Sequence, residues 1–182
     1  METNSDHSED LKSKDVAYRT KITTPDGTKP IERIENGDTV LAFSSKLESG
    51  KIKLTASNQT VSYSAGVEGQ RSLMVYFDLR NFDDSRIDLI CSLDQPLLLI
   101  NGKYARAGKL GKGQELVNKE GNPVTINSAS MGYYQGGIHA IVTNAPTNKL
   151  PDGHLLLANG IIIGDFIMQS HFDQLDNAIK EI

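Results

Sequence analysis

The chain has 182 residues and a formal net charge of −4, with one cysteine and no tryptophan. This length suits one domain that buries about 70% of its unfolded surface, and a single cysteine excludes internal disulfides and Cys-based metal clusters. The mild acidity argues against nucleic acid as a partner, and no apolar run approaches the roughly 20 residues of a membrane span.

The first 14 residues are polar, contain a single leucine and show no periodicity. Such a segment cannot bury enough apolar surface to offset its ordering entropy, so we expect residues 1–14 to be a disordered tail. The segment also lacks the basic start and the apolar stretch of a signal peptide, which predicts a cytoplasmic protein.

From about Thr20 to Phe166, short apolar or alternating runs are separated by turn signals such as Asn36-Gly37 and Asn101-Gly102. Many short strands at this spacing are typical of an all-β sandwich or barrel. We expect strands over residues 21–24, 39–43, 73–77, 87–91, 96–100, 124–126, 138–142 and 155–163.

The clearest predicted element is a hairpin over residues 155–163. Two apolar runs flank Asn159-Gly160, and a type I′ turn needs positive φ at both central residues, which Asn and Gly accept. Both arms are apolar on both faces, so the hairpin should be central and buried.

The segment that follows Phe166 has a different pattern. Its apolar residues fall near helical spacing among polar ones, which predicts one C-terminal amphipathic helix. We expect this helix to pack on the domain, with a partner-docking face as the alternative. The stripe consists of Phe166, Ile167, Phe172, Leu175 and Ile179.

A faint internal repeat relates the two halves of the chain. The segments 31–34 and 37–41 resemble 107–110 and 113–117, because both run apolar, x, basic, apolar and then, after two residues, Gly, polar, x, apolar, apolar. The similarity is either a coincidence or the trace of a fold built from two β subunits with a pseudo-twofold arrangement.

Three motifs in order resemble those of Hint domains, the hedgehog/intein self-processing module. The first runs from Thr23 to Leu41, the second begins at Asp94-Gln-Pro-Leu-Leu98, and the third is His154-Leu-Leu-Leu-Ala-Asn-Gly-Ile-Ile-Ile163. The resemblance implies an all-β Hint fold of pseudo-twofold β subunits over residues 15–166, with a C-terminal amphipathic helix over 167–182.

Hint domains cleave the peptide bond at their own N-terminus, which implies a specific set of site residues. A Cys or Ser in first position attacks the preceding carbonyl, and the His of a Thr-x-x-His motif supports that step. Inteins then use a penultimate His and a terminal Asn, which cyclises to cut the second bond.

The resemblance places this chain's N-terminal site residues at Asp15, Ser92 and Gln95. Asp15 stands at the nucleophile position, and its carboxylate cannot perform the same acyl shift. The Thr-x-x-His motif reads Ser92-Leu-Asp-Gln95. A Gln side chain can hydrogen-bond a carbonyl, but it cannot shuttle a proton near neutral pH.

At the C-terminal junction the resemblance gives His154 and Asp165. The terminal His-Asn reads Gly164-Asp165. An ionised carboxylate is a poor reactant for cyclisation, and no His precedes it. His154 alone matches a family residue that assists this step, although a structural role at the start of the hairpin is the alternative.

The remaining candidate groups favour structural roles. Cys91 ends an apolar run, so we expect a buried core residue. Alternation along 138–142 predicts a solvated His139, and no two histidines share a metal-ligand spacing, so we expect neither a metal nor a cofactor. One hypothesis remains from the family geometry: Asp15, Gln95 and Asp165 could converge in a pocket that binds a cation or a peptide amine.

These observations leave three functional hypotheses. The first is a degenerate Hint domain that no longer rearranges its backbone and is retained as a binding or structural module. The second is an active self-processing domain that cuts at Asp165 with the assistance of His154, and the third is an unrelated β-barrel that binds a small ligand or peptide. We expect a monomer with an unidentified protein or peptide partner, and neither nucleic acid nor membrane.

Overall fold

A computed structural model describes residues 16–181 of the chain. The expected disordered tail and Asp15 therefore lie outside the described residues. Within 16–181, no helix is both long enough and apolar enough to cross a bilayer.

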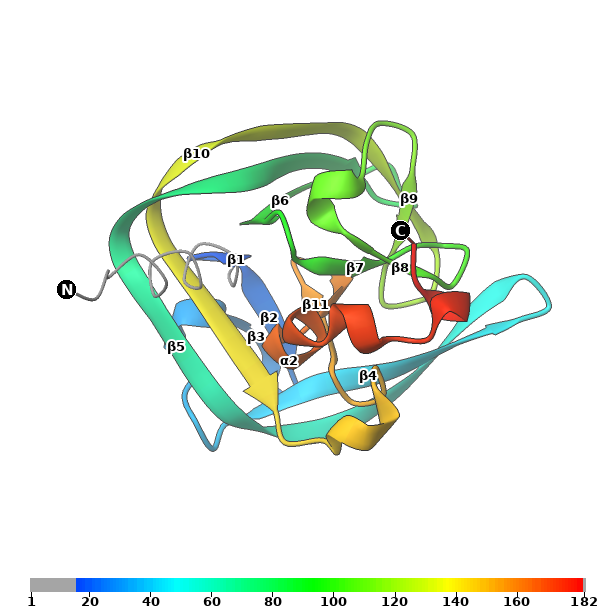
Figure 1. Ribbon diagram of the computed structural model, residues 1–182, viewed down its shortest axis with the longest axis horizontal. Helices are drawn as coiled ribbons and strands as arrows, with labels where there is room; N and C mark the ends of the chain where they lie inside the picture. Colours follow the sequence, from blue (N-terminus) through cyan, green and yellow to red (C-terminus); the bar gives the residue numbers. More distant parts are fainter. Residues whose placement is uncertain (1–15, 182) are drawn as a thin grey trace.

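Twelve strands connected by antiparallel pairings form the architecture, with few helical turns (Figure 1). The strands are β1 (Val16–Ala17), β2 (Lys21–Thr24), β3 (Gly27–Pro30), β4 (Thr39–Glu48), β5 (Lys51–Arg80), β6 (Arg86–Ser92), β7 (Pro96–Leu98), β8 (Tyr104–Arg106), β9 (Glu115–Val117), β10 (Pro123–Thr143), β11 (Leu155–Ala158) and β12 (Ile161–Gly164). The helical elements are η1 (Ile31–Arg33), η2 (Ala107–Lys109), η3 (Thr147–Lys149), α2 (Phe166–Ser170), η4 (Phe172–Gln174) and η5 (Asn177–Ile179).

Two long strands, β5 and β10, run side by side around the outside of the molecule (Figure 1). They pair from Arg80↔Thr125 to Val61↔Thr143, with three register irregularities that let the ribbon bend. β5 includes the expected strand 73–77, and β10 includes the expected strands 124–126 and 138–142, together with polar segments for which no strand is expected. Much of this ribbon faces solvent, so its sequence carries no continuous apolar alternation.

At one end of the ribbon the sheet closes into a ring. β5 pairs with β10 and with β6, and the two-residue strand β1 joins β6 to β10. Val16 lies opposite both Cys91 on β6 and His139 on β10. Among residues 16–181, Val16 and Ala17 of β1 therefore close the ring.

The internal repeat is a real structural repeat. η1 and η2 occupy equivalent places, each after a short antiparallel hairpin. The Ile31 N–H that begins η1 donates to the Thr20 carbonyl at 2.8 Å, and the Ala107 N–H that begins η2 donates to the Gln95 carbonyl at 2.9 Å. The chain is thus two related β subunits, and Gln95 in the second corresponds to Thr20 in the first.

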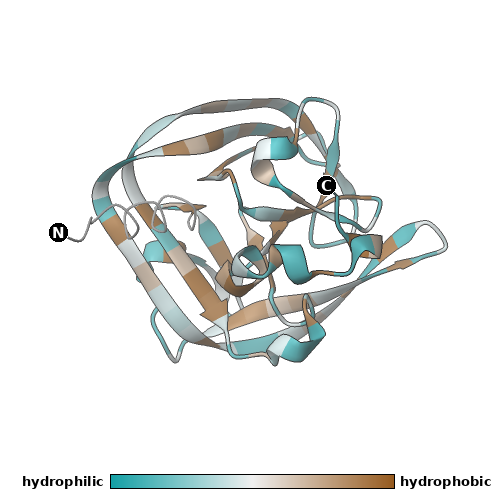
Figure 2. Ribbon diagram, viewed as in Figure 1, coloured by the Kyte–Doolittle hydropathy of each residue, from teal (hydrophilic) through white to brown (hydrophobic). Residues whose placement is uncertain are grey.

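The predicted Asn-Gly hairpin is confirmed. β11 and β12 pair across the turn with Ala158 opposite Ile161, and every residue of both arms is buried. Asn159 and Gly160 have φ of 51° and 83°, as a type I′ turn requires. The hairpin lies at the centre of the molecule, where hydrophobic segments gather in Figure 2.

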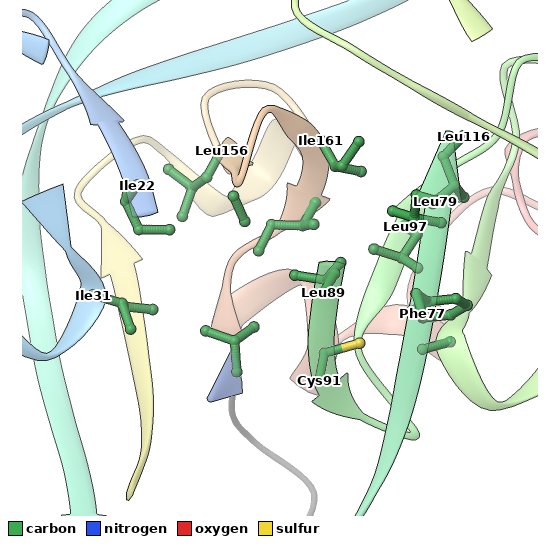
Figure 3. Close-up of a cluster of buried hydrophobic side chains, with 14 of the residues drawn as sticks. Ile22, Ile31, Phe77, Leu79, Leu89, Cys91, Leu97, Leu116, Leu156 and Ile161 are labelled. Atoms are coloured by element: carbon green, nitrogen blue, oxygen red, sulfur yellow. The ribbon is translucent and has the colours of Figure 1, made fainter. Parts of the chain in front are cut away.

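Two apolar clusters form the core. The larger one lies between the β subunits and includes Cys91, whose side chain is fully buried beside Leu89 (Figure 3). Burial raises the pKa of this thiol well above its ordinary value. The expectation that Cys91 is a core residue rather than a nucleophile is confirmed.

The C-terminal segment differs from the single helix that its apolar spacing predicts. α2 ends after five residues, and the chain continues as the 3₁₀ turns η4 and η5. Leu175 is extended between these turns, and the Asp176 side chain caps η5 by accepting from the Ala178 N–H. Because the helix is interrupted, Met168, Phe172 and Leu175 all pack in the second core cluster. The other members of this cluster are Phe43, Ile52, Leu98, Tyr104, Val117, Leu155, Leu157 and Ile162.

Phe172 anchors this segment and supplies a test of its packing. The side chain is 2% exposed, and the Arg106 guanidinium lies 4.4 Å from its ring centroid. Phe172→Ala should lower the free energy of unfolding by about 3–5 kcal/mol, because it opens a cavity in the core. Phe82→Ala is the matched control, since Phe82 is 65% exposed and its loss should change stability by less than about 0.5 kcal/mol. Denaturant unfolding of both variants checks this, and similar small effects would contradict the packing.

Candidate functional site

Three of the expected site residues meet where β12 passes into α2. His154 and Asp165 contact each other directly, and Gln95 contacts the carbonyl of Gly164, next to Asp165 in the chain. Ser92 is fully buried, and its carbonyl accepts from the Gln95 main-chain N–H at 3.2 Å. Asp15 lies outside the described residues, so its place in this cluster stays a prediction.

The Asp165 carboxylate is the centre of this cluster. Oδ1 accepts from the Met168 N–H at 3.1 Å, which caps α2, and Oδ2 accepts from the Thr143 N–H at 3.0 Å. Oδ2 also lies 2.8 Å from Nδ1 of His154. Main-chain N–H groups only donate, so both oxygens act as acceptors. The carboxylate therefore holds three separate segments together.

The contacts of His154 define where its protons are. Nε2 lies 3.0 Å from the Ala145 carbonyl and 3.3 Å from the Pro146 carbonyl. A carbonyl only accepts, so Nε2 must carry a proton. Nδ1 faces the Asp165 carboxylate and, at 3.3 Å, the Thr143 hydroxyl, which donates to the Gly153 carbonyl. When the ring is protonated, Nδ1 can donate to the carboxylate, so this arrangement favours the imidazolium form of His154.

This ion pair is completely buried, with both side chains 0% exposed. Burial alone lowers the pKa of His154, but the hydrogen bond and the negative charge of Asp165, together with the two carbonyls at Nε2, outweigh burial and raise it. A buried pair of this kind is strongly destabilising to break on one side, because the remaining charge is left unpaired.

Gln95 uses its amide group to fix the backbone at the same junction. Nε2 donates to the Gly164 carbonyl at 2.6 Å and to the Pro96 carbonyl at 3.2 Å, and the residue is 4% exposed. Gln95 therefore links β7 to the end of β12 through a neutral amide group. The resemblance expects a proton-transferring histidine at this position.

The space between these groups is too small for a ligand. A cavity of about 10 Å³ is lined by Val16, Gln95, His139, Gly164 and Asp165, among others, and can hold no more than about one water molecule. Asp165 already has three hydrogen-bond partners, so it offers little to a cation or a peptide amine. Within residues 16–181, no group of three or more His, Cys, Asp or Glu side chains could hold a metal ion.

The expectation of a solvated His139 is wrong. His139 is 8% exposed and lies on the inner face of the ring, opposite Val16 and Gly66. Alternation predicts one solvated face, but both faces of β10 are covered here, since residues 138–143 are all buried. A register irregularity also lies between Gly136 and Ile138.

Sequence reasoning missed Thr143, which contributes its N–H to Asp165 and its hydroxyl to the Gly153 carbonyl. Thr143 ends a 21-residue strand and has no distinctive neighbours in the sequence. The carbonyls that face His154 belong to the connection after that strand. Main-chain groups leave no residue-type signal, so no sequence pattern could have located them.

Comparison with known proteins bears on the fold. No family model and no curated protein matches the sequence. Among solved structures, a bacterial intein-like domain from Clostridium thermocellum is 18% identical, with a TM-score of 0.65 over 84% of this chain and 99% of that chain. The gp41-1 intein is 20% identical, with a TM-score of 0.57 over 83% and 98%. The MchDnaB-1 intein is 16% identical, with a TM-score of 0.57 over 82% and 99%.

These likenesses show that the chain has the Hint fold found in inteins. The all-β fold class and the pseudo-twofold arrangement predicted from the sequence are confirmed. The hypothesis of an unrelated β-barrel is wrong, since inteins share this topology over most of the chain.

The buried histidine pair makes stability depend on pH in a defined direction. The pKa of His154 is raised in the folded state, so its contribution is fully present below the unfolded value of about 6.5 and is lost as pH rises through the folded pKa. Denaturant unfolding should show stability falling above pH 6.5, by no more than about 1.4 kcal/mol per pH unit for one proton.

Two substitutions separate His154 from other titrating groups. His154→Gln should remove this alkaline decline, whereas His171→Gln should keep it, because the half-buried His171 contacts only the Ile167 carbonyl. An unchanged alkaline decline in His154→Gln would show that the proton is not held at this pair.

Proposed function

We propose that this chain is a Hint-fold domain that keeps its backbone intact and serves as a structural or binding module. The observation that carries the proposal is the hydrogen bonding of Asp165. Its carboxylate is divided among Thr143, His154 and Met168, so the group that would have to attack the backbone is held as a helix cap and ion-pair partner.

The carbonyl that C-terminal cleavage would attack is also engaged. The Asp165 carbonyl accepts from the Gln169 N–H at 3.1 Å, as the first main-chain acceptor of α2. The two carboxylate oxygens accept from the Met168 N–H and the Thr143 N–H. Cyclisation would therefore require α2 to unwind and the buried ion pair to separate.

The segment after this junction is part of the fold. Met168 and Phe172 are 0% and 2% exposed in the second core cluster. Arg106 forms an ion pair with Asp173 at 3.0 Å, and the Glu181 N–H donates to the Tyr104 carbonyl at 2.9 Å. A segment that stabilises the domain in this way is poorly suited to release.

The N-terminal step lacks a proton-transferring group at its expected place. Gln95 cannot accept or release a proton near neutral pH, and both of its amide hydrogens have carbonyl partners. We propose that Gln95, His154 and Asp165 together form a junction clamp whose task is structural.

Active self-processing is the second candidate, and one contact favours it. His154 lies 2.8 Å from Asp165, as an assisting acid–base group would. The same carboxylate also accepts from the Thr143 and Met168 N–H groups, so we rank this function below the first. As a module, the domain would bind a protein or peptide, in line with the absence of a ligand-sized space at the junction.

Intact-mass measurement tests the proposal. The purified chain, incubated for days between pH 5 and pH 9, should keep a single unchanged mass. Asp165→Asn introduces the residue that inteins cyclise, yet it should also remain uncut, because Asn can still cap α2 through its side-chain oxygen. Asp26→Asn, at an exposed position in the turn between β2 and β3, is the matched control.

One outcome would overturn the proposal. Loss of the fragment that begins at Phe166, abolished by His154→Ala, would establish C-terminal cleavage. A cut beside residue 15 in the unmodified chain would establish the N-terminal step.

A further inference from the structure

We propose that His139 is an acid-sensitive latch, which keeps the strand β1 in the sheet at neutral pH and lets it leave when the imidazole becomes charged. His139 lies on the ring formed by β5, β6, β1 and β10, and it lines the same cavity of about 10 Å³ as Gln95 and Asp165 of the junction clamp. His139 lies directly opposite Val16 of β1.

One ring nitrogen of His139 has a defined partner. Nε2 lies 2.7 Å from the Ser64 hydroxyl, and that hydroxyl donates its hydrogen to the Ile34 carbonyl at 2.5 Å. Because the hydroxyl's hydrogen is already used, Nε2 must donate to its oxygen. Neutral His139 therefore carries its proton on Nε2 and a bare lone pair on Nδ1.

The other ring nitrogen has no partner. Within residues 16–181, Nδ1 is buried and makes no hydrogen bond, and the residue is 8% exposed. A Cβ placed on Gly66 would lie 2.5 Å from Nδ1, so the ring is pressed against bare backbone. A buried acceptor without a partner is tolerable, but protonation would create a buried charged donor without an acceptor.

The groups that face His139 do not compensate for that charge. Tyr18, from the turn after β1, approaches with ring centroids 6.1 Å apart, and Ser64 of β5 is neutral. Glu32 of η1 attracts the charged ring, and its carboxylate accepts from the Arg19 N–H. Asp165 lines the same small cavity as His139, but its carboxylate is already bonded to His154. Burial outweighs the attraction of Glu32 and lowers the pKa of His139.

The described part of β1 makes few pairings with its neighbours. Its residues Val16 and Ala17 form two residue pairs with β10 and one with β6. The Tyr18 N–H donates to the Gly137 carbonyl at 2.9 Å, which continues the same ladder. Short elements with few hydrogen bonds open locally before the whole protein unfolds.

Linkage gives the direction of the effect. Once β1 has left, His139 is solvated and has the ordinary pKa of about 6.5, whereas the closed form has a lower one. The open form therefore binds the proton more tightly. Its population relative to the closed form rises as pH falls below about 6.5, by at most tenfold per pH unit.

Amide hydrogen exchange of the full chain measures this opening. The reporter is the Tyr18 amide, with exchange normalised to the intrinsic rate at each pH between 7.5 and 5.0. Its protection factor should fall severalfold below pH 6.5. The Gly113 amide, which donates to the Ile126 carbonyl at 2.9 Å in the second subunit, should keep its protection.

His139→Gln supplies the decisive variant, because Gln is neutral at every pH and can still donate to Ser64. Acid-induced exchange at Tyr18 should disappear in this variant and persist in His171→Gln. If His139→Gln fails to fold, NMR titration of the His139 ring in the unmodified chain takes its place, and its midpoint should lie below 6.5. Persistence of the acid response in His139→Gln, a pH-independent Tyr18 protection factor, or a midpoint at or above 6.5 would overturn the latch.

Discussion

The buried carboxylate of Asp165 is the constraint on which the junction of this domain depends. Burying a charge is strongly unfavourable unless hydrogen bonds and an opposite charge compensate for it. Here that compensation comes from the end of β10, the start of β11 and the first turn of α2. Each segment must be in place for the carboxylate to be satisfied. The carboxylate thereby links the start of the C-terminal segment to the end of β10 and the start of β11.

The duplicated architecture explains why these groups come together. Each subunit supplies a hairpin, a 3₁₀ turn and a long strand, and the long strands β5 and β10 wrap around both. The repeat places Gln95 where Thr20 stands in the first subunit, at the carbonyl that begins the 3₁₀ turn. The β11–β12 hairpin then passes through the centre and delivers Gly164 and Asp165 to that point. A self-processing junction and a structural clamp both need this convergence, so the same fold can serve either.

Local turn chemistry and apolar pattern made much of this fold predictable. Asn159-Gly160 admits a type I′ turn and little else, and its apolar arms fix the hairpin at the centre. The full length of β5 was not predictable, because from Lys51 to Arg71 its residues are mostly exposed and need no apolar alternation. The single helix expected after Phe166 is wrong. The spacing of its apolar residues fits one continuous helix, but it fits equally well a short helix followed by two 3₁₀ turns.

The candidate site was predictable only where a residue type carries the chemistry. His154 and Asp165 were identified through the motif, whereas their dependence on Thr143 follows from a main-chain N–H. His139 was misplaced because alternation assumes one solvated face, and the ring formed around β1 covers both. A main-chain hydrogen-bond partner leaves no local signal in a sequence. The pairing of strands that are distant in the chain leaves none either.

A double-mutant cycle between His154 and Asp165 tests the central claim most directly. Unfolding free energies of the unmodified chain, His154→Gln, Asp165→Asn and the double variant would be measured at pH 6, where the imidazolium is retained. If the two groups form one buried unit, each single change should cost far more alone than after the other, with a coupling energy of about 1–3 kcal/mol. Single effects that add to within about 0.5 kcal/mol would show that Asp165 does not hold the junction through His154.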